Sequence, residues 1–345
     1  MLRGLLDTLL RMACCALVSL IALGSWLSAA VATTNVQHSG ERLFATVWAP
    51  SEGAGPEANA QSCAVCHSTP RIGGGGGPGT VVLISPETTD PTGGRLFRQF
   101  LIRPKRAVVR QPLPSRVFRR GPPSLLGLGL LEGADVRSIV VHADPEDRDG
   151  DGVSGRMAAG GGRVGCKARF ATLDSAVAAA FVNELGLTNA MFGEHGTRET
   201  EVGDAELRAL TEFVRTLAPP SRPRGDSEGR AEFTAFGCAA CHVPQLRGVS
   251  DRHGTLVEAF TDLLLHDMGP ELADLPEGDA AAGEFRTPPL WGLGSMGGPY
   301  LHNGSATTLD AAIRAHGGEG GSARHRYEQA STRRRAALLR FLGSL

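Results

Sequence analysis

The sequence has few aromatic residues, almost no net charge and few cysteines. Only 5% of its 345 residues are Phe, Trp or Tyr, whereas it contains 46 Gly and 21 Pro. This composition predicts short helices joined by long irregular loops. A net charge of −1 indicates neither nucleic-acid binding nor attachment to an anionic membrane surface. The length exceeds the usual size of one domain and predicts two.

Most of the cysteines outside the leader segment belong to a pattern that occurs twice. The two copies are Cys63-Ala-Val-Cys66-His67 and Cys238-Ala-Ala-Cys241-His242. C-x-x-C-H is the attachment signature of haem c: two thiols add across the vinyl groups, and the histidine presents its imidazole to the iron. The alternative, a zinc ribbon, needs thiols in a reducing compartment, which the leader argues against. We therefore predict two covalently bound haems with His67 and His242 as iron ligands.

The N-terminal segment has the pattern of an export signal. Arg3 and Arg11 precede an apolar run over residues 12–27, and small residues follow up to Ala32. This pattern is typical of a secretory signal peptide over residues 1–32. Retention as a membrane anchor is the alternative, because the apolar run approaches the ~20 residues that a span needs. Covalent haem attachment fits an exported chain, so we expect the protein in a bacterial-type periplasm.

The segments that follow each haem motif repeat in the same order. Arg120–Gly129 corresponds to Arg286–Gly294, Ala171–Val177 to Thr307–Ile313, and the amphipathic segment 205–217 to 333–345. This order indicates a tandem duplication. Consecutive prolines in Pro219–Gly225 mark the boundary, so the predicted domains are residues 33–222 and 223–345. We expect a mainly α protein of two tandem cytochrome c-like domains with long irregular loops.

The first unit also carries an acidic insertion. Asp147, Asp149 and Asp151 alternate along the chain and Gly152 follows them, as in the first half of a calcium-binding loop. The glutamate expected at the twelfth position is replaced by Ala158. The pattern predicts either a calcium site or an acidic glycine-rich turn without an ion.

A second insertion is cationic. Residues 95–120 contain nine Arg and Lys side chains and no acidic one. Such a run is usually a solvated face, and otherwise it would receive haem propionates or an acidic electron-donor protein.

The repeat predicts that the two haem irons differ in their second ligand. His316 lies seven residues after Leu309, so a helix that begins at the Thr-Leu-Asp turn presents its imidazole two turns later. Seven residues after Leu173 the first unit has Ala180. We therefore expect the second haem to be closed by His242 and His316, and the first haem to lack a ligand at this position. An open iron binds a small molecule, whereas a closed one only passes electrons.

Other axial ligands remain possible at this stage. Met268 and Met296 compete with His316, because thioether ligation is common in cytochromes c. His142 and His195 are the candidates that would close the first haem.

Four segments resemble a known family. They are Gly127–Glu132, Leu263–Gly269, Phe285–Leu290 and Pro299–Ile313. They are similar to the bacterial diheme c-type oxidoreductases, some of which are named "putative peroxidase" or "thiol oxidoreductase", and which are related to the diheme cytochrome c peroxidases. The resemblance runs from about Gln61 to the C-terminus. The label "thiol oxidoreductase" gains little support, because Cys166 is the only thiol that remains once both haems are attached.

The resemblance implies roles for several residues. The second haem would be the electron-transfer centre, with His316 where the peroxidases have methionine, and the first haem would be the peroxide site. A calcium ion between the haems would be expected. Cys166 stands where the peroxidases place a bridging tryptophan, so electrons would cross directly or through a group such as Trp291. Glu184 is the nearest match to the peroxidase acid-base glutamate, and Glu132 is the second candidate.

These predictions describe a periplasmic diheme oxidoreductase with peroxidase-like activity. A small electron-donor protein of cytochrome c or cupredoxin type would reduce the second haem, and peroxide or a similar small oxidant would react at the first. One alternative is an electron-transfer cytochrome without a substrate. Another is an enzyme that matures a protein partner by oxidation, because such an enzyme shares the architecture.

Overall fold

The computed structural model describes residues 36–52, 54–90, 92–103, 107–193, 200–221, 226–248 and 256–345. The predicted signal peptide, the predicted domain junction at 222–223 and His195 lie outside these residues. Within the described part of the chain, no helix is both long enough and apolar enough to form a membrane span.

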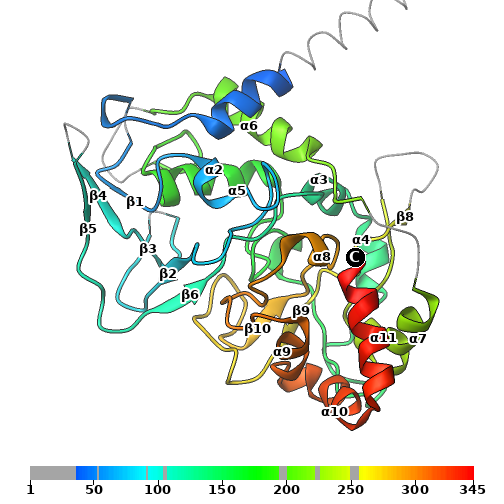
Figure 1. Cartoon of the computed structure of the whole chain (residues 1–345). Helices are drawn as coiled ribbons and strands as arrows, with labels where there is room; N and C mark the ends of the chain where they lie inside the picture. Colours follow the sequence, from blue (N-terminus) through cyan, green and yellow to red (C-terminus); the bar gives the residue numbers. More distant parts are fainter. Residues whose placement is uncertain are drawn as a thin grey trace, which may run out of the picture.

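Most helices are short and are separated by loops, as the Gly and Pro content predicts (Figure 1). In the first unit they are residues 36–45, α2 (Cys63–Cys66), α3 (Leu128–Glu132), α4 (Val136–Val140), α5 (Leu173–Ala180) with its π-helical continuation η4 (Phe181–Leu185), and α6 (Asp204–Thr216). In the second unit they are α7 (Ser227–Ala235), α8 (Leu293–Met296), α9 (Leu309–Arg314), α10 (Gly321–Gln329) and α11 (Thr332–Gly343). Short 3-10 turns are η1 (Pro50–Glu52), η3 (Ala159–Gly161), η5 (Cys238–Ala240) and η6 (Gly318–Gly320).

Four small antiparallel sheets accompany the helices, so the prediction of a mainly α chain with irregular loops is correct only in part. The sheets are β1-β4-β5, β3-β2-β6, β7-β8 and β9-β10. Their strands are β1 (Glu57–Ala58), β2 (Val82–Ile84), β3 (Leu96–Phe97), β4 (Phe100–Arg103), β5 (Ala107–Arg110), β6 (Phe118–Arg120), β7 (Leu246–Arg247), β8 (Leu256–Val257), β9 (Leu265–Asp267) and β10 (Glu284–Arg286). Strands β1 to β6 all belong to the first unit, and Figure 1 shows them on the side of the molecule away from α10 and α11.

Each unit is closed by the same contact between its first and last helices. In the first unit, Phe44 packs edge to face on Phe213, with ring centroids 5.4 Å apart and an interplanar angle of 61°. In the second unit, Phe233 packs on Phe341 with a centroid distance of 5.6 Å and an angle of 61°. The four rings are buried, and each pair lies in the core of its own unit. The predicted duplication is therefore visible as a repeated core contact.

A glycine one turn before each of these phenylalanines allows the helices to cross closely. A Cβ atom on Gly40 would overlap the carbonyl oxygen of Ala209, and a Cβ atom on Gly229 would overlap that of Ala337. The two acceptor residues occupy equivalent positions of α6 and α11. The glycines thus permit backbone contact where any side chain would separate the helices.

The Arg-x-Pro-Pro segments of the two units dock on the last helices in the same way. The amide of Gly127 donates to the carbonyl of Leu217 at 2.8 Å, and the amide of Gly292 donates to that of Leu345 at 2.6 Å. Both glycines have a positive φ, 79° and 82° respectively, which only glycine adopts without strain. In each unit, this hydrogen bond therefore fixes the Arg-x-Pro-Pro segment to the end of the last helix.

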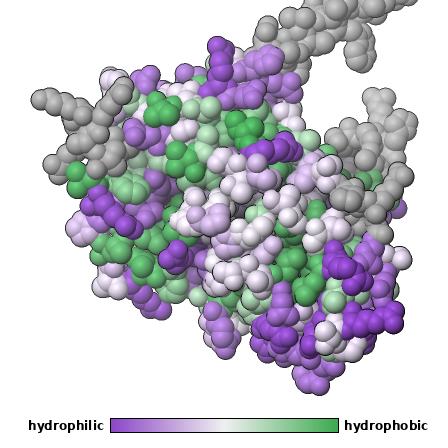
Figure 2. Space-filling model, in the orientation of Figure 1, coloured by the Kyte–Doolittle hydropathy of each residue, from purple (hydrophilic) through white to green (hydrophobic). Residues whose placement is uncertain are grey.

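The surface of the second unit is strongly polar. Figure 2 shows hydrophilic residues gathered over the C-terminal helices α10 and α11. Several arginines there pair with acidic residues of α7, as Arg334 does with Glu232 at 2.7 Å. These exposed pairs contribute little to stability, which comes from the buried aromatic cluster below them.

The glycine at the helix crossing of the second unit gives a test of this packing. Gly229→Ala should reduce the free energy of unfolding by about 1–3 kcal/mol, because the added methyl group overpacks the crossing. Gly321→Ala in α10 is the matched control, because nothing lies within 4 Å of the added Cβ. Denaturant unfolding of the haem-loaded proteins measures both. Equal midpoints for the two variants would contradict the close crossing.

Candidate functional site

The first haem motif forms a single turn that projects His67 into the protein. Ser62 caps α2 by accepting a hydrogen bond from the amide of Ala64 at 3.3 Å, and the amide of His67 donates to Cys63 O at 3.0 Å. His67 Nδ1 lies 3.1 Å from Pro123 O and 3.3 Å from Gly74 O. Because carbonyls only accept, Nδ1 carries the proton and Nε2 keeps its lone pair for a metal.

The second haem motif repeats this arrangement. The amide of His242 donates to Cys238 O at 3.0 Å, and His242 Nδ1 lies 3.0 Å from Phe260 O. Burial lowers the pKa of both His67 and His242 to about 4. The two rings are therefore neutral at physiological pH and suited to iron ligation.

The ring of His316 is held in the same way as the rings of His67 and His242. Its Nδ1 lies 2.7 Å from Ala312 O, and burial lowers its pKa. Burial lowers the pKa of His242 most, and the charge of His316 lowers it further. The neutral rings of His242 and His316 are both suited to iron ligation.

Met268 also reaches this position. A Cβ atom on Gly320 would lie 3.2 Å from His316 Cδ2 and 3.4 Å from Met268 Cε, so the two side chains border the same space. Met268 therefore stays a competing ligand by position. Met296 ends α8 and is not part of this group.

An apolar cavity lies next to the first haem motif. Its lining includes Cys63, Cys66 and His67 together with Ala180 at the end of α5. Thr172 and Thr308 cap α5 and α9 by accepting from the amides of Ser175 and Ala311, which fixes the register of the two helices. By count from these caps, Ala180 corresponds to His316. Ala180 is still in α5, whereas α9 ends at Arg314 and His316 lies two residues beyond it. At this point of the chain the first unit has a methyl group that lines the cavity, and the second has an imidazole.

Glu184 is an acidic side chain in the lining of this cavity. Asn59 Nδ2 donates to Glu184 Oε2 at 2.8 Å. Burial raises the pKa of Glu184 to about 7, although the bond from Asn59 opposes the shift. Charge on Glu184 contributes to the raised pKa of Cys66, which places the carboxyl near the attachment cysteines. A carboxyl with a pKa near neutrality both accepts and donates protons.

Glu132, the second predicted acid-base residue, lies outside the lining of the cavity. Its Oε1 accepts from the amide of Leu173 at 2.7 Å, and its Oε2 accepts from Arg215 Nε at 2.8 Å. Burial is the largest influence and acts to raise the pKa of Glu132, but the hydrogen bonds from Arg215 and Leu173, together with the charges of Arg215 and Arg163, outweigh it and the pKa is lowered. These contacts tie Glu132 to the start of α5 and to Arg215, so its role is structural.

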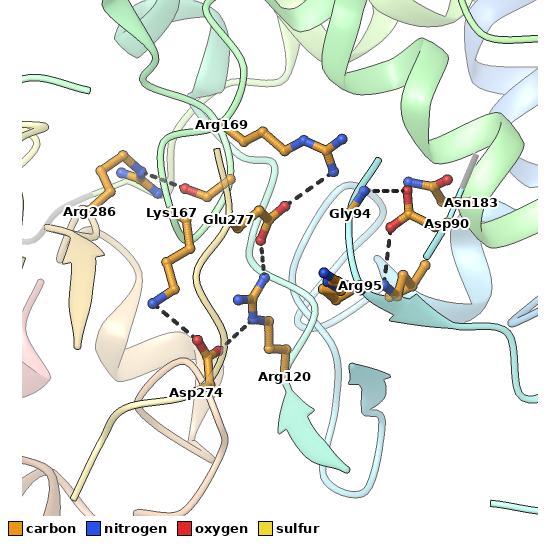
Figure 3. A network of polar contacts seen from close by, with 12 residues as sticks. Asp90, Gly94, Arg95, Arg120, Lys167, Arg169, Asn183, Asp274, Glu277 and Arg286 are labelled. Atoms are coloured by element: carbon orange, nitrogen blue, oxygen red, sulfur yellow. Dashed lines mark hydrogen bonds and ion pairs between the residues drawn. The ribbon is translucent and has the colours of Figure 1, made fainter. Parts of the chain in front are cut away.

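Ionic contacts between the two units form part of the cavity wall (Figure 3). Arg120 Nε lies 2.7 Å from Asp274 Oδ2, Lys167 Nζ lies 3.0 Å from Asp274 Oδ1, and Arg169 Nη1 lies 3.3 Å from Glu277 Oε1. Arg120 also pairs with Glu277. Arg120 ends the cationic run, so the interpretation of that run as a solvated face fails at this residue, whose side chain is only 12% exposed.

Arg286 provides a test of whether the site fits an anionic cofactor. Its guanidinium donates to Gly165 O and to Thr287 O, both at 3.0 Å. Among the described residues no carboxylate forms an ion pair with Arg286, although it is buried and burial lowers its pKa. A buried cation held only by carbonyls needs a counter-charge. A haem propionate would supply one, so the residues present fit the predicted cofactor.

Cys166 and Trp291, the residues considered for an electron route between the haems, both lie near contacts between the units. Cys166 lines the cavity, and burial raises the pKa of its thiol. Trp291 belongs to the second unit but packs into the core of the first, where a Cβ atom on Gly127 would overlap its ring. The buried Nε1 of Trp291 has no hydrogen-bond partner in the described part of the chain. Trp291 therefore lies at the junction of the units, as an electron route between them requires.

The aspartates of the acidic insertion come together. Ligand oxygens of Asp147, Asp149 and Asp151 all lie within 4.8 Å of one another. Backbone amides of the same loop already bind them: Gly152 N donates to Asp147 Oδ1 at 3.1 Å and Val153 N donates to Asp151 Oδ1 at 2.8 Å. Both readings of the sequence, a calcium loop and an acidic turn, have this geometry.

The sequence did not single out a buried charged group beside the second haem motif. His266 lies between the carboxylates of Asp262 and Glu319. The segment Leu263–Gly269, which we named above only for its resemblance to the family, was the signal in the sequence that could have pointed to this group.

Comparison with known proteins finds a family match in the C-terminal part. Residues 210–345 match the family described as "Di-haem oxidoreductase, putative peroxidase", which agrees with the resemblance and whose name refers to two haems. Among solved structures, the chain is similar to Kuenenia stuttgartiensis hydrazine synthase pressurised with 20 bar xenon, at 15% identity over 90% of this chain and 92% of that chain, with a TM-score of 0.44. It is also similar to a MauG-like protein associated with microbial copper homeostasis, at 17% identity over 90% and 88% of the two chains, with a TM-score of 0.41. No curated protein matches the chain.

Substituting Ala180 and His316, which correspond by count from the threonine caps, tests the ligand difference. His316→Gly should convert one low-spin ferric haem to high spin, because the second haem loses its imidazole. Ala180→His should do the reverse at the first haem, since it adds an imidazole in the cavity. Low-temperature electron spin resonance of oxidised and partly reduced samples measures both. Spectra that both substitutions leave unchanged would remove the assignment of His316.

Proposed function

We propose that this chain, whose residues 210–345 belong to the di-haem oxidoreductase family, is a peroxidase-like enzyme of two cytochrome c-like units. Cys238 and Cys241 would hold one haem and Cys63 and Cys66 the other, and the two haems would supply the electron transfer with which peroxide or a similar small oxidant is reduced at the first unit. One observation carries the proposal. Where the second unit has His316, the first unit has a cavity that the half-buried carboxyl of Glu184 lines.

The protein groups around the first cavity each have a task in this reaction. Haem iron supplies one-electron chemistry and a position at which the oxidant is held. His67 offers Nε2 because its Nδ1 proton is bound to Pro123 O. The apolar lining excludes water, and Ala180 leaves the space in which peroxide fits.

Glu184 transfers the proton. In its ionised form it takes a proton from one peroxide oxygen, and it returns this proton to the oxygen that leaves as water. Asn59 binds Oε2, so Oε1 is the oxygen available for transfer. The full reaction consumes one peroxide, two electrons from the donor and two protons, and forms two waters.

The cavity favours this enzyme over the alternatives predicted from the sequence. A carrier without a substrate has no use for a half-buried carboxyl with a pKa of about 7 beside open space. Binding of carbon monoxide to the reduced protein separates these two functions. One reactive haem supports the enzyme, whereas two inert haems at every oxidation level leave an electron carrier.

We place the reaction in the periplasm, with a small cytochrome c or a cupredoxin as electron donor. The support is the export pattern over residues 1–32 and the covalent attachment of haem. Release of the protein from cells by osmotic shock would agree with this location, and retention in the cytoplasmic fraction would contradict it.

Glu184→Gln tests the proton transfer. We expect a 10²- to 10⁴-fold loss of kcat/KM for peroxide, because the amide cannot accept the proton. In the unchanged protein, kcat/KM should rise with pH through about 7, as Glu184 ionises. This rising limb of the pH profile should be absent from the variant. Steady-state rates across pH measure both effects.

Glu132→Gln is the control for this experiment. It removes a carboxylate that binds Leu173 and Arg215, so it should lower the midpoint of unfolding and keep the limb near pH 7. If Glu132→Gln and not Glu184→Gln abolished the limb, the two assignments would have to be exchanged.

We further propose that the acidic insertion binds calcium through Asp147, Asp149 and Asp151. The support is the convergence of their oxygens within 4.8 Å. Calorimetric titration of chelator-treated protein should show one calcium site, and Asp149→Asn should weaken it at least tenfold because it removes a ligand charge. Arg148 lies between these ligands, so Arg148→Gln, which leaves all three carboxylates, is the control. Absence of binding heat would leave an acidic turn without an ion.

A further inference from the structure

A buried charged group connects three segments around the second haem motif. His266 in β9 lies with Nε2 2.9 Å from Asp262 Oδ2 and with Nδ1 2.6 Å from Glu319 Oε2. His266 is 2% exposed and Asp262 is 0% exposed. Because each ring nitrogen faces a carboxylate oxygen, both nitrogens carry protons. One positive ring between two carboxylates leaves the group with a net negative charge.

This group touches the predicted haem attachment. His266 Nδ1 lies 3.5 Å from Cys241 Sγ. A cation site built from Cys241, Asp262 and His266 is excluded in the haem-loaded protein, because the thiol is consumed by attachment and both ring nitrogens are already bound. The charge of the group therefore lies next to the edge of the second haem.

Glu319 holds the group to the rest of the molecule. Besides His266, its carboxylate accepts from the amide of Asp267 at 3.0 Å and from the amide and hydroxyl of Ser154 at 3.0 and 2.9 Å. Ser154 belongs to the acidic insertion of the first unit. Glu319 lies in η6, three residues after His316, so its bonds fix the segment that follows this predicted ligand.

We infer that Glu319 is a positioning residue of the second haem: it fixes the His316 segment and, with Asp262, holds negative charge beside the haem that lowers its reduction potential. The physical reason is that oxidation adds a positive charge to the haem, which a nearby anion stabilises. Burial keeps solvent and salt from screening the interaction. The inference rests on the proposed function only in requiring a haem at Cys241, and not on any reaction with peroxide.

Glu319→Gln tests the inference, since it keeps the shape of the side chain and removes the charge. In a potentiometric titration of the diheme protein, we expect the ratio of reduced to oxidised second haem to rise about tenfold at a fixed potential, a shift of about 59 mV. The first haem should not change. Glu228→Gln, which removes an exposed carboxylate on α7, is the matched control and should change neither potential.

A second variant separates position from charge. Glu319→Asp keeps the charge but is one methylene shorter, so it cannot bind both Ser154 and the His266–Asp267 segment at once. We expect it to alter the low-spin electron spin resonance signal of the second haem while its potential stays close to that of the unchanged protein. This variant also serves as the test if Glu319→Gln does not retain two haems.

The inference would be overturned if Glu319→Gln matched Glu228→Gln in potential and Glu319→Asp left the resonance signal unchanged. These readouts need no turnover. A protein that lacks peroxidase activity but shows the shift would therefore reject the proposed function and keep this inference, and the opposite result is equally distinguishable.

Discussion

The structure depends on keeping imidazole rings half-buried, neutral and fixed by backbone carbonyls. His67, His242 and His316 each bind a carbonyl oxygen through Nδ1, which leaves Nε2 free. Helix-interior carbonyls are occupied by the helix itself, so such acceptors must come from loops or helix ends. Pro123 O and Phe260 O come from loops, and Ala312 O lies near the end of α9. The short helices and long connections of this chain follow from that requirement.

Within one repeated frame, a few side chains give the two units different chemistry. The helix crossings, the threonine caps and the glycine docking points are equivalent in both units. After the caps the two units diverge: α5 continues through Ala180 into η4, which carries Glu184, whereas α9 ends at Arg314 and His316 lies in the segment before η6. Glu184 lines the cavity of the first unit, whereas His316 lies beside Met268 in the second. The point at which the helix ends therefore decides which side chain each unit presents.

Features that depend on local pattern could be predicted from the sequence, and those that depend on distant contacts could not. The C-x-x-C-H turns, the helices after Thr172 and Thr308 and the repeat itself are local. Strands such as β2 were missed because their pairing partners lie in the insertion. Glu132 and Glu184 were indistinguishable as letters, and only burial and the contact with Arg215 separate them. The partners of His266 lie as far as 53 residues away along the chain.

The ion pairs between the units limit how far either unit could stand alone. Asp274 and Glu277 of the second unit pair with Arg120, Lys167 and Arg169 at the cavity of the first. A unit separated from the other would leave these charges without ion-pair partners, although each unit has its own aromatic core.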